Sequence, residues 1–231
     1  MKKMQSRLLV SALFSVASVS AMAQSKFEGV YGQVGIGYEN VAPSLSSSGV
    51  SVGGVAYPYG ISAGNANSVT GTATLGYTFA INKDFLLGIG GEYSPVASNS
   101  QQVTNTFASN LSGSYNKQNA YNVFISPSFS VSTDGLAYAK VGFTGAQFQS
   151  TALVDSATKN FTGYSLGLGY KQFISGGLYA FGEINYASYG NQSATQNFAA
   201  PSGPNAGKPV SLSMSSSFNV TNLLIGVGYR F

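Results

Sequence analysis

The sequence predicts an all-β fold, a transmembrane eight-stranded antiparallel up-and-down β-barrel with short periplasmic turns and long extracellular loops. Three observations support this prediction. Apolar residues alternate with small polar ones in segment after segment beyond residue 24, which is the period of a strand with different surroundings on its two faces. Charged residues make up only 8% of the 231 residues, against about 25% in soluble domains. Finally, short and long connections take turns between the alternating segments.

The first residues have the composition of a cleaved export signal. Three positive charges precede an apolar run over residues 8–19, and the small-x-small sequence Ala21-Met22-Ala23 follows. This order is typical of a secretory signal peptide. The apolar run is too short for a membrane-spanning helix, which needs about 20 residues. We therefore expect a signal peptide over residues 1–23 and the barrel domain over residues 24–231.

Eight segments carry the alternation, most of them close to the 9–11 residues or so that a tilted strand needs to cross a bilayer. They are residues 30–38, 69–79, 85–93, 121–129, 136–145, 164–171, 178–186 and 222–231. In the second segment Val69, Leu75 and Phe79 share the apolar face, while threonines dominate the other. In the fifth, the opposite phase would place Lys140 in lipid at a cost of about 2–4 kcal/mol.

One residue does not fit a closed barrel. Pro127 lies inside the fourth segment, and a closed barrel has no free edge on which proline is tolerated. We therefore expect a bulge at Pro127 or a ladder that ends early there.

The connections indicate which end of the barrel faces the periplasm. Short turns occupy residues 82–84, 132–135 and 175–177, and long segments rich in Ser, Gly and Asn occupy residues 40–68, 94–119, 146–161 and 188–217. Outer-membrane barrels place the short turns in the periplasm and the long loops outside. The sequence leaves open whether the long loops extend the hairpins. Outward aromatic residues predict two interfacial girdles, with Tyr77, Phe79, Phe85, Phe129, Tyr170, Tyr229 and Phe231 below and Tyr38, Tyr93, Tyr121 and Tyr186 above.

The closing segment Asn222-Leu-Leu-Ile-Gly-Val-Gly-Tyr-Arg-Phe231 resembles the last strand of small outer-membrane β-barrels of the porin-like and opacity-protein-like family. Residues 163–170 with 178–186 look like that family's last hairpin but one, and residues 32–38 like its first strand. The resemblance implies a Gram-negative outer membrane, with lipid and lipopolysaccharide as surroundings. It also implies that the barrel assembly machinery recognises the terminal residues Tyr229 and Phe231.

Composition argues against enzymatic chemistry. The chain has no histidine and no cysteine, so a Ser-His arrangement, a thiolate nucleophile and the commonest metal ligands are excluded. The acids Glu39 and Asp155 are too scattered for a calcium site. Without the three basic residues of the leader, eight basic residues face seven acidic ones, so no basic patch predicts nucleic acid as a partner. We expect no enzyme activity, no cofactor and no metal.

A few charges nevertheless face the predicted lumen. Glu92, Glu183 and Lys140 point inward by the alternation, as does Lys171. They could simply pair across the lumen, because an unpaired buried charge is costly. The sharper hypothesis is that Glu92, Lys140 and Glu183 form a lumenal gate.

The sequence leaves the function between a few classes. The interior of an eight-stranded barrel is just wide enough to be filled by side chains, and the inward residues Phe124, Tyr179, Phe181 and Leu224 could plug it. That favours a structural role, or a surface-interaction role in adhesion or shielding that the loops carry through a host or surface ligand. The alternative is a narrow passive pore for small solutes along the many lumenal Gly, Ser and Thr residues.

Overall fold

The computed structural model describes residues 25–58, 60–105, 113–151, 156–200 and 203–231, and every helix or strand assigned in them is a β-strand. None of these residues belongs to a helix long and apolar enough to cross a membrane. The predicted signal peptide, residues 1–23, lies outside the described residues and stays a prediction.

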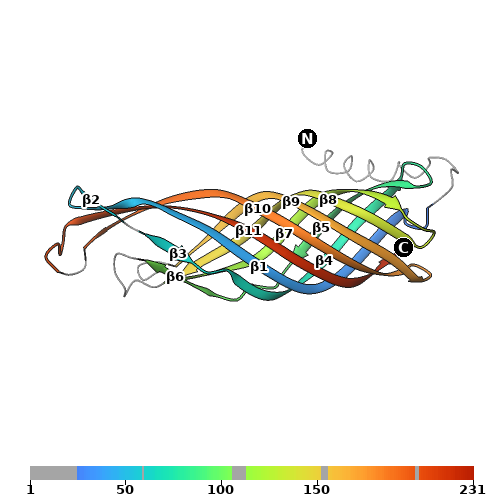
Figure 1. Cartoon of the computed structure of the whole chain (residues 1–231), viewed down its shortest axis with the longest axis horizontal. Helices are drawn as coiled ribbons and strands as arrows, with labels where there is room; N and C mark the ends of the chain where they lie inside the picture. Colours follow the sequence, from blue (N-terminus) through green and yellow to red (C-terminus); the bar gives the residue numbers. More distant parts are fainter. Residues whose placement is uncertain (1–24, 59, 106–112, 152–155, 201–202) are drawn as a thin grey trace, which may run out of the picture.

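Eight long strands form a closed ring (Figure 1). The ring order is β7-β5-β4-β1-β11-β10-β9-β8, and β8 pairs back with β7 in antiparallel register. Three short strands, β2, β3 and β6, pair at the end opposite to the short turns. The bounds are β1 Gly29–Val52, β2 Val55–Tyr57, β3 Ile61–Ala63, β4 Ala66–Ala80, β5 Phe85–Ser94, β6 Gln101–Asn105, β7 Gly113–Ser130, β8 Gly135–Thr151, β9 Ser156–Ser175, β10 Leu178–Ala199 and β11 Pro209–Arg230. The predicted eight-stranded barrel is confirmed.

The two faces of the strands follow the predicted alternation. On β4 the side chains of Val69 and Leu75 are exposed, while the threonines between them point into the barrel and are buried. Lys140 is buried in the lumen, as the phase chosen for its segment requires. The barrel therefore presents an apolar outside to lipid and a small, mostly polar inside.

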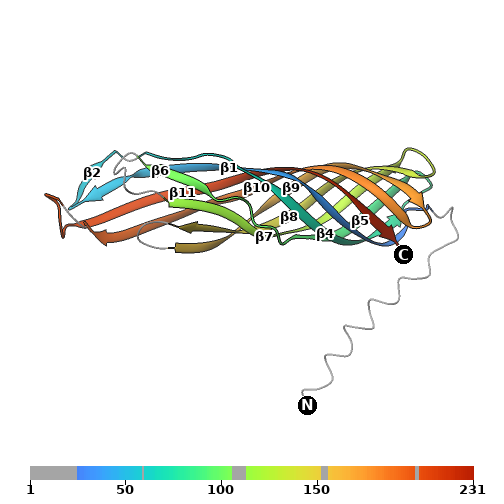
Figure 2. The ribbon, with the colours of Figure 1, turned by 90° about the horizontal axis from the view of Figure 1, so that it is seen from below.

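Several strands are much longer than a membrane crossing. β1 has 24 residues, and β10 and β11 have 22 each. They run on beyond the barrel as a tall sheet in which Val52 still pairs with Val210, and Ala199 with Pro209 (Figures 1 and 2). We call this sheet the extension and define it as residues 42–57, 190–200 and 203–217.

The extension answers a question that the sequence left open: the long segments over residues 40–68 and 188–217 do extend the hairpins, and much of them is paired strand. Ser, Gly and Asn are poor or indifferent strand formers, so their composition resembled loop. The barrel below fixes the register in which these hairpins leave the membrane. Pairing therefore continues upward through residues with little intrinsic preference for it.

Neither of the two expected features, a bulge or an early end of the ladder, occurs at Pro127. The ladder between β7 and β8 pairs Ile125 with Val141 and resumes with Ser128 opposite Tyr138 in the same register. The irregularity in this pairing lies elsewhere, between residues 118 and 121. Beside the proline, Ser126 Oγ donates a hydrogen bond of 2.8 Å to the carbonyl of Ala139. The Ser126 hydroxyl thus donates a hydrogen bond to β8 beside Pro127, which has no backbone N–H to donate.

Candidate functional site

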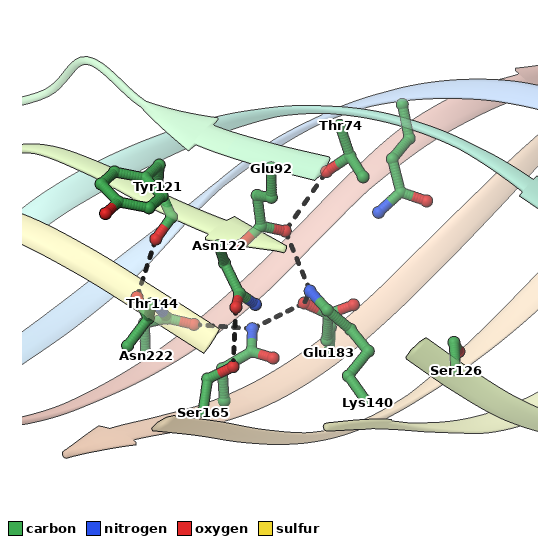
Figure 3. Close-up of polar contacts among 12 residues, drawn as sticks. Thr74, Glu92, Tyr121, Asn122, Ser126, Lys140, Thr144, Ser165, Glu183 and Asn222 are labelled. Carbon is green, nitrogen blue, oxygen red and sulfur yellow. Dashed lines mark hydrogen bonds and ion pairs between the residues drawn. The ribbon is translucent and has the colours of Figure 1, made fainter. Parts of the chain in front are cut away.

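The middle of the lumen holds the three residues singled out from the sequence. Lys140 on β8 lies between Glu92 on β5 and Glu183 on β10, with its Nζ 3.0 Å from Glu92 Oε2 and 2.8 Å from Glu183 Oε1 (Figure 3). The side chain of Glu183 is fully buried and that of Lys140 is 3% exposed. Their pairing across the lumen is therefore a feature of the structure, whereas a gating role stays a prediction.

Further hydrogen bonds hold both carboxylates in place. Tyr138 donates to Glu183 Oε2 over 2.7 Å, and Asn185 donates to Glu183 Oε1 over 2.6 Å. Thr74 donates to Glu92 Oε2 over 3.2 Å. Each carboxylate therefore has at least one donor besides Lys140. A buried network of this kind is rigid.

Lys171 lies nearby and is held by aromatic rings. Its Nζ is 3.9 Å from the ring centre of Tyr31 and 5.1 Å from those of Tyr138 and Tyr179. Ring faces attract a cation, so the tyrosines stabilise this ammonium group. Since Tyr138 also binds Glu183, Lys171 is linked to the Lys140 network.

A second buried ion pair lies nearer the extracellular end. Lys117 Nζ on β7 is 2.6 Å from Glu39 Oε2 on β1, and each side chain is 3% exposed. Sequence reasoning missed both residues because it placed them in loops. Continuing the alternation of β1 past Tyr38 would have found Glu39, since Gly37, Glu39 and Val41 all point inward.

Around this level an apolar cluster crosses the lumen. Its buried members come from seven of the eight ring strands, and include Val41 on β1 and Ala66 on β4. We call its rings the aromatic plug, which consists of Tyr115, Phe148, Phe161, Tyr189 and Phe218. Phe148 stacks on Phe218 with ring centres 3.8 Å apart. These residues also lay in or beside predicted loops, so the sequence did not reveal that they meet.

The periplasmic half of the lumen is filled as well. Tyr179, Phe181 and Leu224 form a buried cluster with Tyr31, and all three are residues that the alternation pointed inward. The fourth, Phe124, is also buried and lies under Lys140, whose Nζ is 4.6 Å from its ring centre. A further cluster of Phe27, Leu86 and Leu136 lies at the turn end.

The remaining candidate residues from the sequence, Tyr229 and Phe231, are not buried. Tyr229 and Phe231 lie on the outer face with their ring centres 5.3 Å apart, 49% and 71% exposed. Their recognition by the assembly machinery stays a prediction, and Asp155 lies outside the described residues. Within the described part of the chain, no three acidic, histidine or cysteine residues are placed to share a metal ion.

Comparison with known proteins agrees with this architecture. A family model described as outer membrane protein beta-barrel domain matches residues 9–231. OprG from Pseudomonas aeruginosa is similar in structure, with a TM-score of 0.60, 13% identity, and 90% of this chain and 99% of that chain covered. Neisserial surface protein A (NspA) matches with a TM-score of 0.45, 12% identity, and coverage of 88% and 98%. Ail, the attachment invasion locus protein of Yersinia pestis, matches with a TM-score of 0.42, 15% identity, and coverage of 88% and 99%.

No curated protein matches the sequence. The identities to the solved structures are low, and the likeness to OprG bears on the fold alone. The family match, in contrast, covers nearly the whole chain, and the ring of eight strands agrees with it. The chain belongs to the outer membrane protein β-barrel domain family and is a protein of the Gram-negative outer membrane.

Proposed function

We propose that this protein acts at the cell surface through its extension, in adhesion or shielding, on a barrel that conducts no solutes and catalyses no reaction. The observation that carries the proposal is the filled lumen. Side chains close it at successive levels, from the cluster at Phe27 through the Lys140 network to the aromatic plug.

A passive pore would require several of these levels to open together. A solute would have to separate Lys117 from Glu39, which are 2.6 Å apart. Leaving one charge of a buried pair without its partner costs about 3–5 kcal/mol. The solute would then have to pass the plug, where Phe148 and Phe218 stack. Each level adds to the barrier, so the narrow pore is the weaker of the two candidates.

The surface of the extension is polar and nearly uncharged, which suits contact with another surface. Its outward face is lined by hydroxyl groups, and Ser193 and Ser215 lie 2.7 Å apart across β10 and β11, as do Thr195 and Ser213 at 2.9 Å. Among its residues only Lys208 is charged. A nearly neutral surface does not repel another surface of either sign. This supports contact with other surfaces rather than steering of charged solutes.

Shortening the extension tests the proposal. In the variant, residues 192–216 are replaced by an Asn-Gly turn, which keeps the pairing of Tyr189 with Phe218 below. Folding is checked by the heat-dependent electrophoretic mobility of barrels. We expect no conductance steps in planar bilayers from either protein, and adhesion of protein-bearing vesicles or cells to test surfaces from the full-length chain only. Reproducible steps from the full-length barrel, or adhesion that survives the shortening, would overturn the proposal.

A further inference from the structure

The extension is an open sheet, although the barrel below it is closed. Its strand order is β2-β1-β11-β10, so it has one edge on the β1 side and another on β10. β9 pairs with β10 only as far as Gly163 opposite Tyr189. Above that level, the described residues supply no backbone partner for the free side of β10. Figure 2 shows the extension running beyond the other strands.

The edge on the β1 side is protected against pairing. Pro43 removes an N–H from it, and the register shifts between Ser47 and Val50. β2 then covers residues 50–52, and Pro58 follows β2 directly. Proline, bulges and very short edge strands are the devices by which natural sheets avoid pairing with other chains.

The edge on β10 lacks these devices along most of its length. A register shift between Tyr189 and Gln192 marks its base, and residues 192–199 above it pair regularly with β11. Their sequence, Gln-Ser-Ala-Thr-Gln-Asn-Phe-Ala, contains no charge and no proline. Such a stretch is about 26 Å long, and about half of its backbone groups point away from β11. It is a template for another strand.

The side chains along this edge suit a copy of the same edge. Antiparallel pairing with Thr195 on the two-fold axis would set Ser193 opposite Asn197, and Ala194 opposite Gln196. Hydroxyl and amide groups both donate and accept hydrogen bonds, and Thr–Thr pairs are favourable neighbours across strands. No like charges would meet. A two-fold interface of this kind is self-complementary and closed.

The direction of the strands decides where the second copy must be. Antiparallel strands in one sheet are related by a two-fold axis perpendicular to the sheet. The extension runs along the long axis of the barrel (Figures 1 and 2), so the two barrels would point in opposite directions. Barrels in one membrane all point the same way. Edge-to-edge antiparallel pairing therefore has to join two facing membranes.

We propose that residues 192–199 of β10 pair with the same edge of a second copy in a facing membrane, so that the protein binds cells to one another. This inference rests on the proposed surface function and names its partner. The partner is recognised by backbone hydrogen bonds and neutral side chains.

Vesicles of two colours test the pairing. Both carry the full refolded chain with the extension outside, and their co-clustering is followed by two-colour fluorescence correlation. We expect wild-type vesicles to cluster and Thr195→Lys vesicles to lose the clustering, because lysine is a common protector of sheet edges. Ser46→Lys is the matched control, since Ser46 is exposed on the outer face of β1 near the protected edge. It should cluster like wild type.

Disulfide capture tests the register. The chain has no cysteine, so Thr195→Cys introduces a single thiol. Residues opposite each other in an antiparallel pair have Cα atoms about 4.5–5.5 Å apart, within disulfide range. Mild oxidation should therefore link Thr195→Cys chains from the two vesicle populations, whereas Ser46→Cys chains should stay monomeric.

The outcomes separate this inference from the proposed function. Clustering that persists in Thr195→Lys but disappears when residues 192–216 are removed would overturn edge pairing and leave the surface function standing. Wild-type vesicles that adhere to other surfaces without clustering would do the same. If wild-type vesicles do not cluster, and adhesion to other surfaces survives the removal of residues 192–216, both the edge pairing and the proposed surface function are overturned.

Discussion

Glu39 and Lys117 form an ion pair of 2.6 Å that crosses the barrel lumen, because β1 and β7 are not neighbours in the ring. Both side chains are almost fully buried. The backbone amide of Lys117 also donates to Ser98 Oγ over 2.8 Å. The pair therefore ties two distant strands and the segment after β5 together just where the membrane-spanning barrel gives way to the extension.

Replacing Lys117 with methionine should destabilise the barrel by about 3–5 kcal/mol, because Glu39 would remain buried without its partner. The measurement is urea unfolding in lipid vesicles, with the folded fraction read from heat-dependent mobility. The double variant Glu39→Leu with Lys117→Met is the control, since replacing both charges by apolar groups is often neutral. A single variant as stable as wild type would show that the pair contributes nothing to stability.

Replacing Lys140 with methionine tests the gate hypothesis against a structural role. The substitution leaves Glu183, which is fully buried, and Glu92 without their cation. We expect a loss of about 3–5 kcal/mol by the same reasoning. Bilayer conductance should stay silent, because the Glu39–Lys117 pair and the aromatic plug still close the lumen. Conductance steps from a variant of wild-type stability would instead support a gate at Lys140.

The sequence was sufficient for the barrel and its faces, because period-two alternation and the lipid cost of Lys140 are local properties. It was insufficient for the extension, since serine runs such as residues 46–48 and 215–217 show no alternation of polarity that marks a strand. It was also insufficient for the contacts across the lumen. Which inward residues share a level depends on the stagger of the strands, and that quantity is a property of the closed ring rather than of any segment. Glu39 and Lys117 were both missed because they were placed in loops, and their meeting across the lumen depends on that stagger.

Adjacent glycines on β5 should respond in opposite ways to alanine. A Cβ at Gly90 would lie 2.7 Å from Cζ of Phe124 inside the lumen, whereas a Cβ at Gly91 would meet nothing within 4 Å on the lipid face. Overpacking a filled core costs about 1–3 kcal/mol, so Gly90→Ala should lower the free energy of unfolding. Gly91→Ala should leave it unchanged or raise it by about 0.5–1 kcal/mol, because glycine is entropically costly within a strand. Equal effects of the two substitutions on urea unfolding would contradict the assignment of their faces.

The hydroxyl of Ser126 should matter only while Pro127 is present. Ser126→Ala removes the donor to the carbonyl of Ala139, which the structure places 2.8 Å from Oγ. Leaving a buried acceptor unsatisfied costs about 1–3 kcal/mol, and we expect a loss of that size in urea unfolding. Pro127→Ala supplies a backbone N–H on the same strand. In the Pro127→Ala background, Ser126→Ala should therefore lower the free energy of unfolding much less than it does in wild type. If Ser126→Ala costs the same in both backgrounds, the hydroxyl does not compensate for the proline.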